Sequence, residues 1–439
     1  MILKQTLISC SVASAMLLMT GSAAASGFAL IEQSASGMGN AYAGGAASAE
    51  DASTIFFNPA GMSRLSGKQV VVAAHAIRPS AKFSGTATGL APLQTAGTNT
   101  GGDAGSWALV PNAYFVMELN PKTHLGLGIN APFGLQTQYD PAWVGRFQAI
   151  KSKIETINLN PSVSYDVNDF FSVGAGLNYQ NIKGNLSSAV NYSAAAFSAG
   201  GAGLLAAIGG AGVEGQNNLS GSDNSWGYNF GMLFNFSPQT RAGLAYRSSI
   251  KHHLTGTTSF TNRPALLAAA IPDGAISLDI TLPESLAVSV FHQVNDKWDF
   301  MADMTLTGWS SFQQLKVVRS TGATLLAVPE NWRDTWRVAV GGNYHYSDQW
   351  MARVGAAYDQ APVSDAFRTA RIPDSDRTWL TVGGQYKPNK ESAVDFGYAH
   401  LFVKNSTIAD RQAAVGKGDL IGTYKNSVDI LSVQYAYSF

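Results

Sequence analysis

Apolar and polar residues alternate with a period of two along several stretches of the chain. Between Ser225 and Phe236, one set of alternate positions holds Trp, Tyr, Phe, Met, Phe and Phe, and the other holds Ser, Gly, Asn, Gly, Leu and Asn. Residues 335–346 repeat the pattern. A period of two indicates β-strands, and a polar set rich in Gly and Asn does not suit the dry core of a soluble sandwich. The pattern therefore predicts barrel strands with lipid on one side and a polar lumen on the other.

Short and long connections alternate between the predicted strands. The tight turns lie at 120–122, 166–168, 237–239, 295–297, 347–349 and 388–390, and the long loops at about 85–106, 140–150, 187–224, 257–277, 319–332, 361–376 and 407–424. Short turns on one side and long loops on the other are typical of outer-membrane barrels. The chain also ends with aromatic residues at alternate positions, Tyr435, Tyr437 and Phe439. The sequence thus predicts an all-β fold, a 14-stranded antiparallel transmembrane β-barrel over residues 68–439.

Two segments precede the first predicted strand. Residues 1–25 carry Lys4, an apolar run to Met19 and three alanines before Ser26, which predicts a secretory signal peptide. A lipoprotein signal ending at Cys10 would be too short for a charged region and an apolar core. Residues 26–67 are rich in Ala, Gly and Ser. We expect them to form a hatch that plugs the barrel, because a lumen of this size is too wide for its own side chains to fill; the alternative is a disordered periplasmic tail.

Composition and charge exclude several function classes. Lys and Arg number 29 and Asp and Glu also number 29, so there is no net field to attract nucleic acid. The single cysteine, Cys10, lies in the predicted signal, so a disulfide is not expected in the exported chain. The seven histidines lack metal-ligand spacing, and the sequence shows no nucleophile elbow or phosphate loop. We therefore predict no enzyme activity, no metal and no cofactor. Beyond Ser26, no stretch predicts a membrane-spanning helix.

Two features suggest chemistry that involves hydrophobic ligands. Pro132 and Gly134 interrupt the third predicted strand, which predicts a kink; the kink either opens a gap in the wall or only shapes the rim. Two of the long loops carry uncharged apolar segments, which predict either a landing site for a hydrophobic ligand or packing between loops. The residues concerned are Leu204, Leu205, Ile208, Leu266 and Leu267.

Several motifs together resemble the FadL-type long-chain fatty acid transporters of the Gram-negative outer membrane. The motifs are Ser26-Gly27-Phe28, Asn58-Pro59-Ala60, Phe133-Gly134, Phe312-Gln313-Gln314-Leu315-Lys316 and Ile372-Pro373-Asp374-Ser375-Asp376-Arg377 with Trp379-Leu380. The resemblance implies an amino-terminal hatch, a kinked third strand with a lateral opening, a low-affinity groove in the loops and a high-affinity pocket. It also implies that Phe28 reaches into the pocket, that Asn58, Pro59 and Ala60 anchor the hatch, and that Pro132, Phe133 and Gly134 mark the lateral exit.

One part of the resemblance fails. In the family's archetype an Arg, a Lys and a Ser bind the fatty acid carboxylate, and those positions align here with Ser188, Val328 and Ala131. Lys316, Lys183 or Arg319 could take over that role; otherwise the pocket is more apolar, as in relatives that take up aromatic hydrocarbons. A tail of about sixteen methylenes carries about 13 kcal/mol of gross transfer free energy, against about 1.5 to 3 kcal/mol for one charged hydrogen bond. Binding should therefore survive without the clamp.

The sequence thus predicts passive uptake of long-chain fatty acids or similar hydrophobic compounds. The ligand would be caught by the apolar loops, passed to a pocket between hatch and barrel, and released laterally at the kink. The expected partners are the hydrophobic ligand, outer-membrane lipid and lipopolysaccharide, with no nucleic acid, and the protein is expected to be a monomer. The alternatives are a channel for aromatic hydrocarbons, a general porin and, least supported, a lipase.

Overall fold

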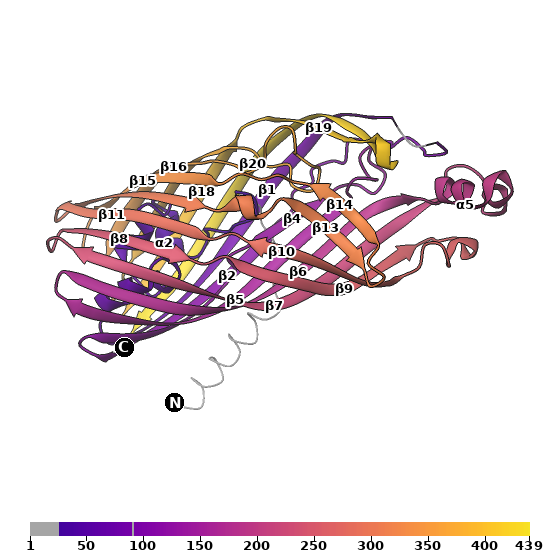
Figure 1. Ribbon diagram of the computed structural model, residues 1–439. Coiled ribbons are helices and arrows are strands. Elements are labelled where there is room, and N and C mark those ends of the chain that lie inside the picture. The colour runs from indigo at the N-terminus through magenta and orange to yellow at the C-terminus, as the bar shows by residue number, and fades with distance from the viewer. Residues whose placement is uncertain (1–25, 90–91) are drawn as a thin grey trace, which may run out of the picture.

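The computed structural model describes residues 26–89 and 92–439, and the predicted signal peptide lies outside the described residues. Their strands form one antiparallel sheet that closes into a barrel (Figure 1). Closure comes from β20 (Gly418–Ser438), which pairs with β1 (Lys68–Thr88) from Gln69↔Ser438 to Thr88↔Asp419. The predicted barrel is confirmed, because the twenty sheet segments of the described residues combine into fourteen wall strands, six of which are interrupted.

The fourteen wall strands follow one another around the barrel in chain order. They are β1; β2 (Ala108–Asn120); β3 (Thr123–Asn130) with β4 (Gly134–Gln138); β5 (Lys151–Asn168); β6 (Phe171–Asn191); β7 (Glu214–Asn235); β8 (Thr240–Arg247) with β9 (Ile250–Thr261); β10 (Gly274–Leu282) with β11 (Ser285–Asn295); β12 (Trp298–Thr307) with β13 (Gln314–Arg319); β14 (Thr324–Pro329) with β15 (Thr335–His345); β16 (Trp350–Asp359); β17 (Arg377–Tyr386); β18 (Ser392–Val403) with β19 (Ser406–Gln412); and β20.

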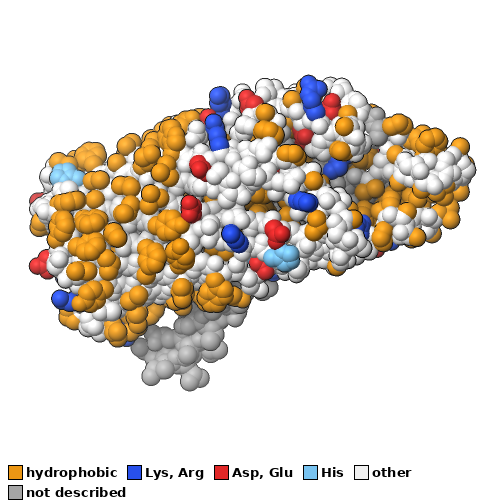
Figure 2. Space-filling view, viewed as in Figure 1, with side chains coloured by type: hydrophobic (Ala, Val, Ile, Leu, Met, Phe, Trp, Pro, Cys, Tyr) orange, Lys and Arg blue, Asp and Glu red, His pale blue; other side chains and the backbone are white. Residues whose placement is uncertain are grey.

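The outer surface carries an apolar band over the end of the barrel that holds the short turns (Figure 2). On β11 the outward Leu286, Val288 and Val290 are exposed, whereas the inward Ser289 is buried. The band ends at the height of Leu286, because the next outward residue toward the loops is the exposed Glu284. This alternation is the one expected of strands between lipid and a filled lumen.

No helix in the described parts of the chain combines the length and the apolar character needed to cross a bilayer.

The strands extend farther beyond the apolar band than the sequence pattern predicts. The predicted loop 187–224 is mostly strand, because β6 and β7 stay paired as far as Asn191↔Glu214. Likewise β19 and β20 occupy most of the predicted loop 407–424. Outside the bilayer neither face of a strand meets lipid, so the alternation that marks a strand disappears while the backbone ladder continues. The loop helices are α5 (Tyr192–Ala207), η2 (Ala265–Leu267), η3 (Trp309–Ser311) and η4 (Ala413–Val415).

The hatch segment, residues 26–67, lies inside the barrel and contains only short helices. They are α2 (Ala35–Met38), α3 (Gly45–Ser48), α4 (Thr54–Phe57) and η1 (Pro59–Arg64). Asn58 is buried between η1 and the wall: its Nδ2 donates to the carbonyls of Ala46 (2.6 Å) and Met232 (2.9 Å), and its Oδ1 accepts from the Ala60 amide (3.0 Å). Gly231 permits this approach, since a Cβ there would lie 1.8 Å from Asn58 Oδ1.

Candidate functional site

Five buried aromatic residues meet in the lumen at the level of the kink, and we call them the aromatic partition. Phe28 is fully buried at its centre. The centroid of the Phe28 ring lies 4.7 Å from that of Trp309, 5.6 Å from Trp332, 5.8 Å from Phe312 and 6.0 Å from Phe133. Mostly edge-to-face pairs such as these contribute about 0.5 to 1.5 kcal/mol each beyond their buried area. The partition thus joins the start of the hatch to the kink and to the opposite wall.

An interruption of the wall brings Trp309 and Phe312 into the lumen. The ladder between β10 and β13 stops at Leu278↔Val317, and pairing resumes at Ser285↔Thr307 between β11 and β12. The intervening residues 308–313 turn through η3 and place both aromatic side chains in the interior, where they are buried. On the outer face this interruption is polar, because Glu284 and Lys316 are exposed beside it.

The partition separates two cavities. The apolar pocket, toward the loops, is lined by Phe312 and by aliphatic side chains of β4 to β7, β9, β10 and β13. The hatch cavity, on the other side, is lined by Phe133 and Trp309 together with hatch residues and the polar Arg247 and Arg337.

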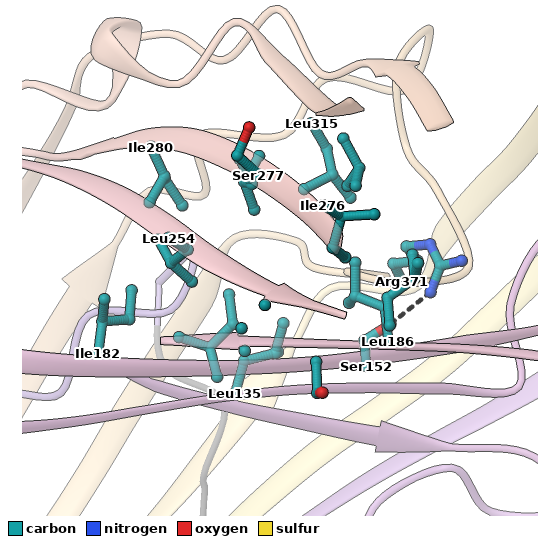
Figure 3. Close-up of a pocket in the computed structure, with 18 of the residues that line it drawn as sticks. Leu135, Ser152, Ile182, Leu186, Leu254, Ile276, Ser277, Ile280, Leu315 and Arg371 are labelled. Atoms are coloured by element: carbon teal, nitrogen blue, oxygen red, sulfur yellow. Dashed lines mark hydrogen bonds between the residues drawn. The ribbon is translucent and has the colours of Figure 1, made fainter. Parts of the chain in front are cut away.

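The apolar pocket has one charged side chain among its lining residues. Leu135, Ile182, Leu254 and Ile280 point into it from different strands (Figure 3). Arg371 lies at the end that faces the loops, where its Nη1 donates to Ser152 Oγ at 3.1 Å. Burial lowers the pKa of Arg371 to about 10, so its guanidinium stays charged at neutral pH. The pocket is therefore an aliphatic cavity with a cation at one end.

The kink leaves a gap in the backbone pairing of the wall, which we call the lateral seam. Pairing between β2 and β3 ends at Ala113↔Ile129, and β4 pairs with β5. The hatch lies against this gap: the Leu30 amide donates to the Pro132 carbonyl and the Gly134 amide to the Phe28 carbonyl, both at 2.8 Å. Because these bonds satisfy backbone groups that a neighbouring strand would otherwise pair, residues 28–30 act as a short substitute strand at the kink.

The clamp positions carried over from the family supply no charged side chain in this protein. The Ala131 carbonyl accepts from Gln33 Nε2 of the hatch at 3.0 Å. Val328 is buried on β14, in the same apolar cluster as Phe28. Ser188 lies on β6, paired with Asn217 of β7.

The three cations that could replace the clamp are also absent from the pocket lining. Lys316 is exposed and alternates with Leu315 and Val317, which line the pocket, so its side chain lies outside the wall. Lys183 is exposed in the same way next to the pocket residue Ile182. Arg319 Nη1 donates to the Pro272 carbonyl at 2.9 Å. The period of two of a strand excludes both lysines from the pocket.

The apolar loop segments pack partly on each other at the far end of the barrel (Figure 1). Leu204 and Ile208 of the α5 region pack with the buried Leu267 of η2, whereas Leu205 is partly exposed and Leu266 is 60% exposed. Hydrophobic side chains are visible on the surface there, beyond a belt that carries most of the charged residues (Figure 2).

Sequence reasoning did not single out Arg371, Trp309 or Trp332. Gly308 ahead of Trp309 was an available signal for a break in the ninth strand. No local pattern indicated that Arg371 would reach β5.

A family model described as "Outer membrane protein transport protein (OMPP1/FadL/TodX)" matches residues 16–439. The chain belongs to this FadL family. The long-chain fatty acid transport protein of Escherichia coli K12 is 31% identical over 443 residues, which cover 95% of this chain and 97% of that protein. The crystal structure of a Pseudomonas aeruginosa FadL homologue superposes with a TM-score of 0.85 at 31% identity, covering 94% of this chain and 100% of that one. The Pseudomonas putida toluene transporter TodX, with a TM-score of 0.66 at 19% identity over 94% of this chain and 100% of that one, shows the shared fold alone.

Membership of the FadL family confirms the resemblance based on the sequence motifs. The protein is a FadL-type outer-membrane transporter of hydrophobic compounds, and its family consists of channels rather than enzymes.

Proposed function

We propose that this FadL-type protein takes up long-chain fatty acids, or chain-like amphiphiles of that kind, by passive diffusion. The observation that carries the proposal is the apolar pocket, whose walls are aliphatic along its length and which has a cation at one end. Such a lining favours a long aliphatic tail joined to an anionic head over a small aromatic ring. The name of the Escherichia coli relative, a long-chain fatty acid transport protein, agrees with this choice.

The proposed route has three stages. The exposed parts of the loop cluster, among them Leu205 and Leu266, capture the ligand, and Leu204, Ile208 and the buried Leu267 hold the cluster together. The ligand then enters the apolar pocket and reaches the aromatic partition with its tail. Movement of residues 28–30 away from the kink opens the lateral seam, and the ligand passes into the membrane.

The free energy of the tail favours a lateral exit over an axial one. Release into the periplasm would return a tail of about sixteen methylenes to water at a cost of about 13 kcal/mol. Release through the seam keeps the tail in hydrocarbon throughout. The outer rim of the seam suits this, because its outward residues are the apolar Leu109, Pro111 and Ile129. The interruption beside Glu284 and Lys316 is polar outside and is a poorer exit.

The function is tested by uptake of labelled oleate into cells that lack their own fatty acid transporter. We expect the wild-type chain to restore uptake, and expect Gly134→Leu, which fills the seam, to lower it at unchanged surface level. Normal uptake by Gly134→Leu would exclude the seam as the exit. Uptake of labelled toluene without uptake of oleate would replace the proposal with aromatic hydrocarbon transport, and a large steady current in planar bilayers would indicate a porin.

A further inference from the structure

Arg371 is the cation at the end of the apolar pocket, and it is held by the two strands that border that end. The residue lies in the loop that precedes β17 and is 3% exposed. Its Nη1 donates to Ser152 Oγ at 3.1 Å, to the Lys151 carbonyl at 3.2 Å and to the Ser187 carbonyl at 3.5 Å. These are contacts with the extracellular parts of β5 and β6. They fix the guanidinium at the mouth of the pocket, where Figure 3 shows it next to Leu186.

Arg371 lacks the acidic partners that hold Arg353 and Arg377, a feature it shares with the buried Arg241 and Arg337, which bond to carbonyls of the hatch. Arg353 forms ion pairs with Asp395 and Glu50, both at 2.7 Å, and Arg377 pairs with Asp374. Within the part of the chain that the structure describes, no ion pair includes Arg371, and the hydrogen bonds of its side chain all use Nη1. Nε and Nη2 therefore remain available on the edge of the guanidinium. This edge matches the two oxygens of a carboxylate.

The charged groups around Arg371 leave this end of the pocket positive at neutral pH. Burial raises the pKa of Glu330, in the connection between β14 and β15, to about 8, so this neighbouring acid is largely neutral at pH 7. Burial and the nearby charge of Arg371 lower the pKa of Lys417 to about 8, which leaves it largely charged at pH 7. Asp410 is the other acid whose charge acts on Arg371. Arg371 and Lys417 are thus two cations beside a largely neutral Glu330, and burial also raises the pKa of Asp410.

We propose that Arg371 and Ser152 form a carboxylate-binding site at the extracellular end of the apolar pocket, which selects ligands with an anionic head and a long aliphatic tail. This inference rests on the proposed function and deepens it. The bound head stays near the loops, while the tail runs past Ile182 and Leu254 toward Phe312 and the partition. Transport is therefore tail-first: the tail reaches the lateral seam while the head is still held by Arg371.

The test compares two ligands that share a tail and differ in the head. Binding of oleate and of oleyl alcohol is measured by titration on purified wild-type protein and on Arg371→Met. We expect Arg371→Met to lower oleate affinity about 10- to 100-fold, the value of one to two charged hydrogen bonds, and to leave oleyl alcohol affinity within about twofold. Lys316→Met is the matched control, since it removes a cation on the outer face, and should change neither affinity.

The outcomes separate this inference from the proposed function. Equal oleate affinity in wild type and Arg371→Met would overturn the head-group site and leave fatty acid uptake standing, whereas a wild-type protein that binds neither ligand would refute the proposed function itself. An equal loss of both affinities in Arg371→Met would mean that Arg371 only shapes the pocket, and would also overturn the site. If Arg371→Met fails to fold, Arg371→Lys provides the test, because lysine keeps the charge but loses the two-point contact with a carboxylate. A loss of affinity for oleate alone would support the site, and an unchanged oleate affinity would overturn it.

Discussion

Replacement of Phe28 by alanine should release the start of the hatch from the lateral seam without unfolding the barrel. The Phe28 side chain is fully buried and packs on Phe133, Trp309, Phe312 and Trp332. Truncation of a buried phenylalanine costs about 3 to 5 kcal/mol. Because opening of residues 28–30 already exposes this ring, the whole cost falls on the closed state. The equilibrium between open and closed hatch should therefore shift toward open by about two to four orders of magnitude.

Amide hydrogen exchange followed by mass spectrometry measures this shift. The reporters are the amides of Leu30 and Gly134, which bond across the seam to the carbonyls of Pro132 and Phe28. When opening is fast and reversible, their exchange should accelerate by the same factor as the opening equilibrium. Amides of β16 and β17, which lie in the intact ladder, should be unaffected.

A second substitution in the hatch serves as the matched control for the loss of a buried side chain. Met62→Ala truncates another fully buried hatch side chain, which packs with Ile55 and Leu65 in an apolar cluster separate from those of Leu30 and Phe133, and should leave the reporter amides protected. Unchanged exchange at Leu30 and Gly134 in Phe28→Ala would show that the ring does not hold the seam closed.

Three further predictions concern the head-group end, the hatch anchor and the loops. Raising the pH from 7 to 9 ionises Glu330 and neutralises Lys417, whose pKa values are both about 8; both changes make the surroundings of Arg371 more negative, so oleate affinity should fall by about threefold to tenfold. Oleyl alcohol affinity should stay constant. An oleate affinity that does not change between pH 7 and 9 would contradict the charges assigned to Glu330 and Lys417. Asn58→Ala removes two buried side-chain hydrogen bonds, to the carbonyls of Ala46 and Met232, at about 0.5 to 1.5 kcal/mol each, and should loosen the hatch and raise the conductance in planar bilayers; a conductance equal to that of the wild type would contradict the role of Asn58 as anchor. Leu266→Ser removes an exposed apolar side chain of the loop cluster and should reduce oleate uptake several-fold at low oleate concentration but not at saturation. An unchanged oleate concentration at half-saturation would exclude capture at this residue.

The barrel wall was predictable where one face of each strand meets lipid. Along β7, Trp226 to Phe236 alternate with small and polar residues, and this local pattern was sufficient to assign a strand. The extracellular part of β6 and β7 could not be assigned in this way, because both faces lie outside the bilayer while the ladder continues to Asn191↔Glu214.

The candidate site was predictable only in part, for a related reason. Pro132 and Gly134 disturb a strand locally, so the kink was visible in the sequence. The role proposed for Arg371 depends on a contact with Ser152, which lies 219 residues earlier in the chain, and no local pattern encodes such a contact. By contrast, Lys316 could have been excluded from the pocket in advance, because it alternates with Leu315 and Val317 on one strand.

The proposed route requires residues 28–30 to leave the kink before a ligand can pass through the lateral seam. Ala29 and Phe133 lie opposite each other in an antiparallel bridge, at a position without direct hydrogen bonds where Cα atoms are about 4.5 Å apart. This separation is within the range of a disulfide, and the exported chain has no other cysteine if the signal is removed as predicted. The decisive measurement is oleate uptake by Ala29→Cys/Phe133→Cys with and without reductant. We expect uptake to be lost on oxidation and restored by dithiothreitol; equal uptake in both states, with the disulfide shown to be formed, would exclude this movement as a step of the route.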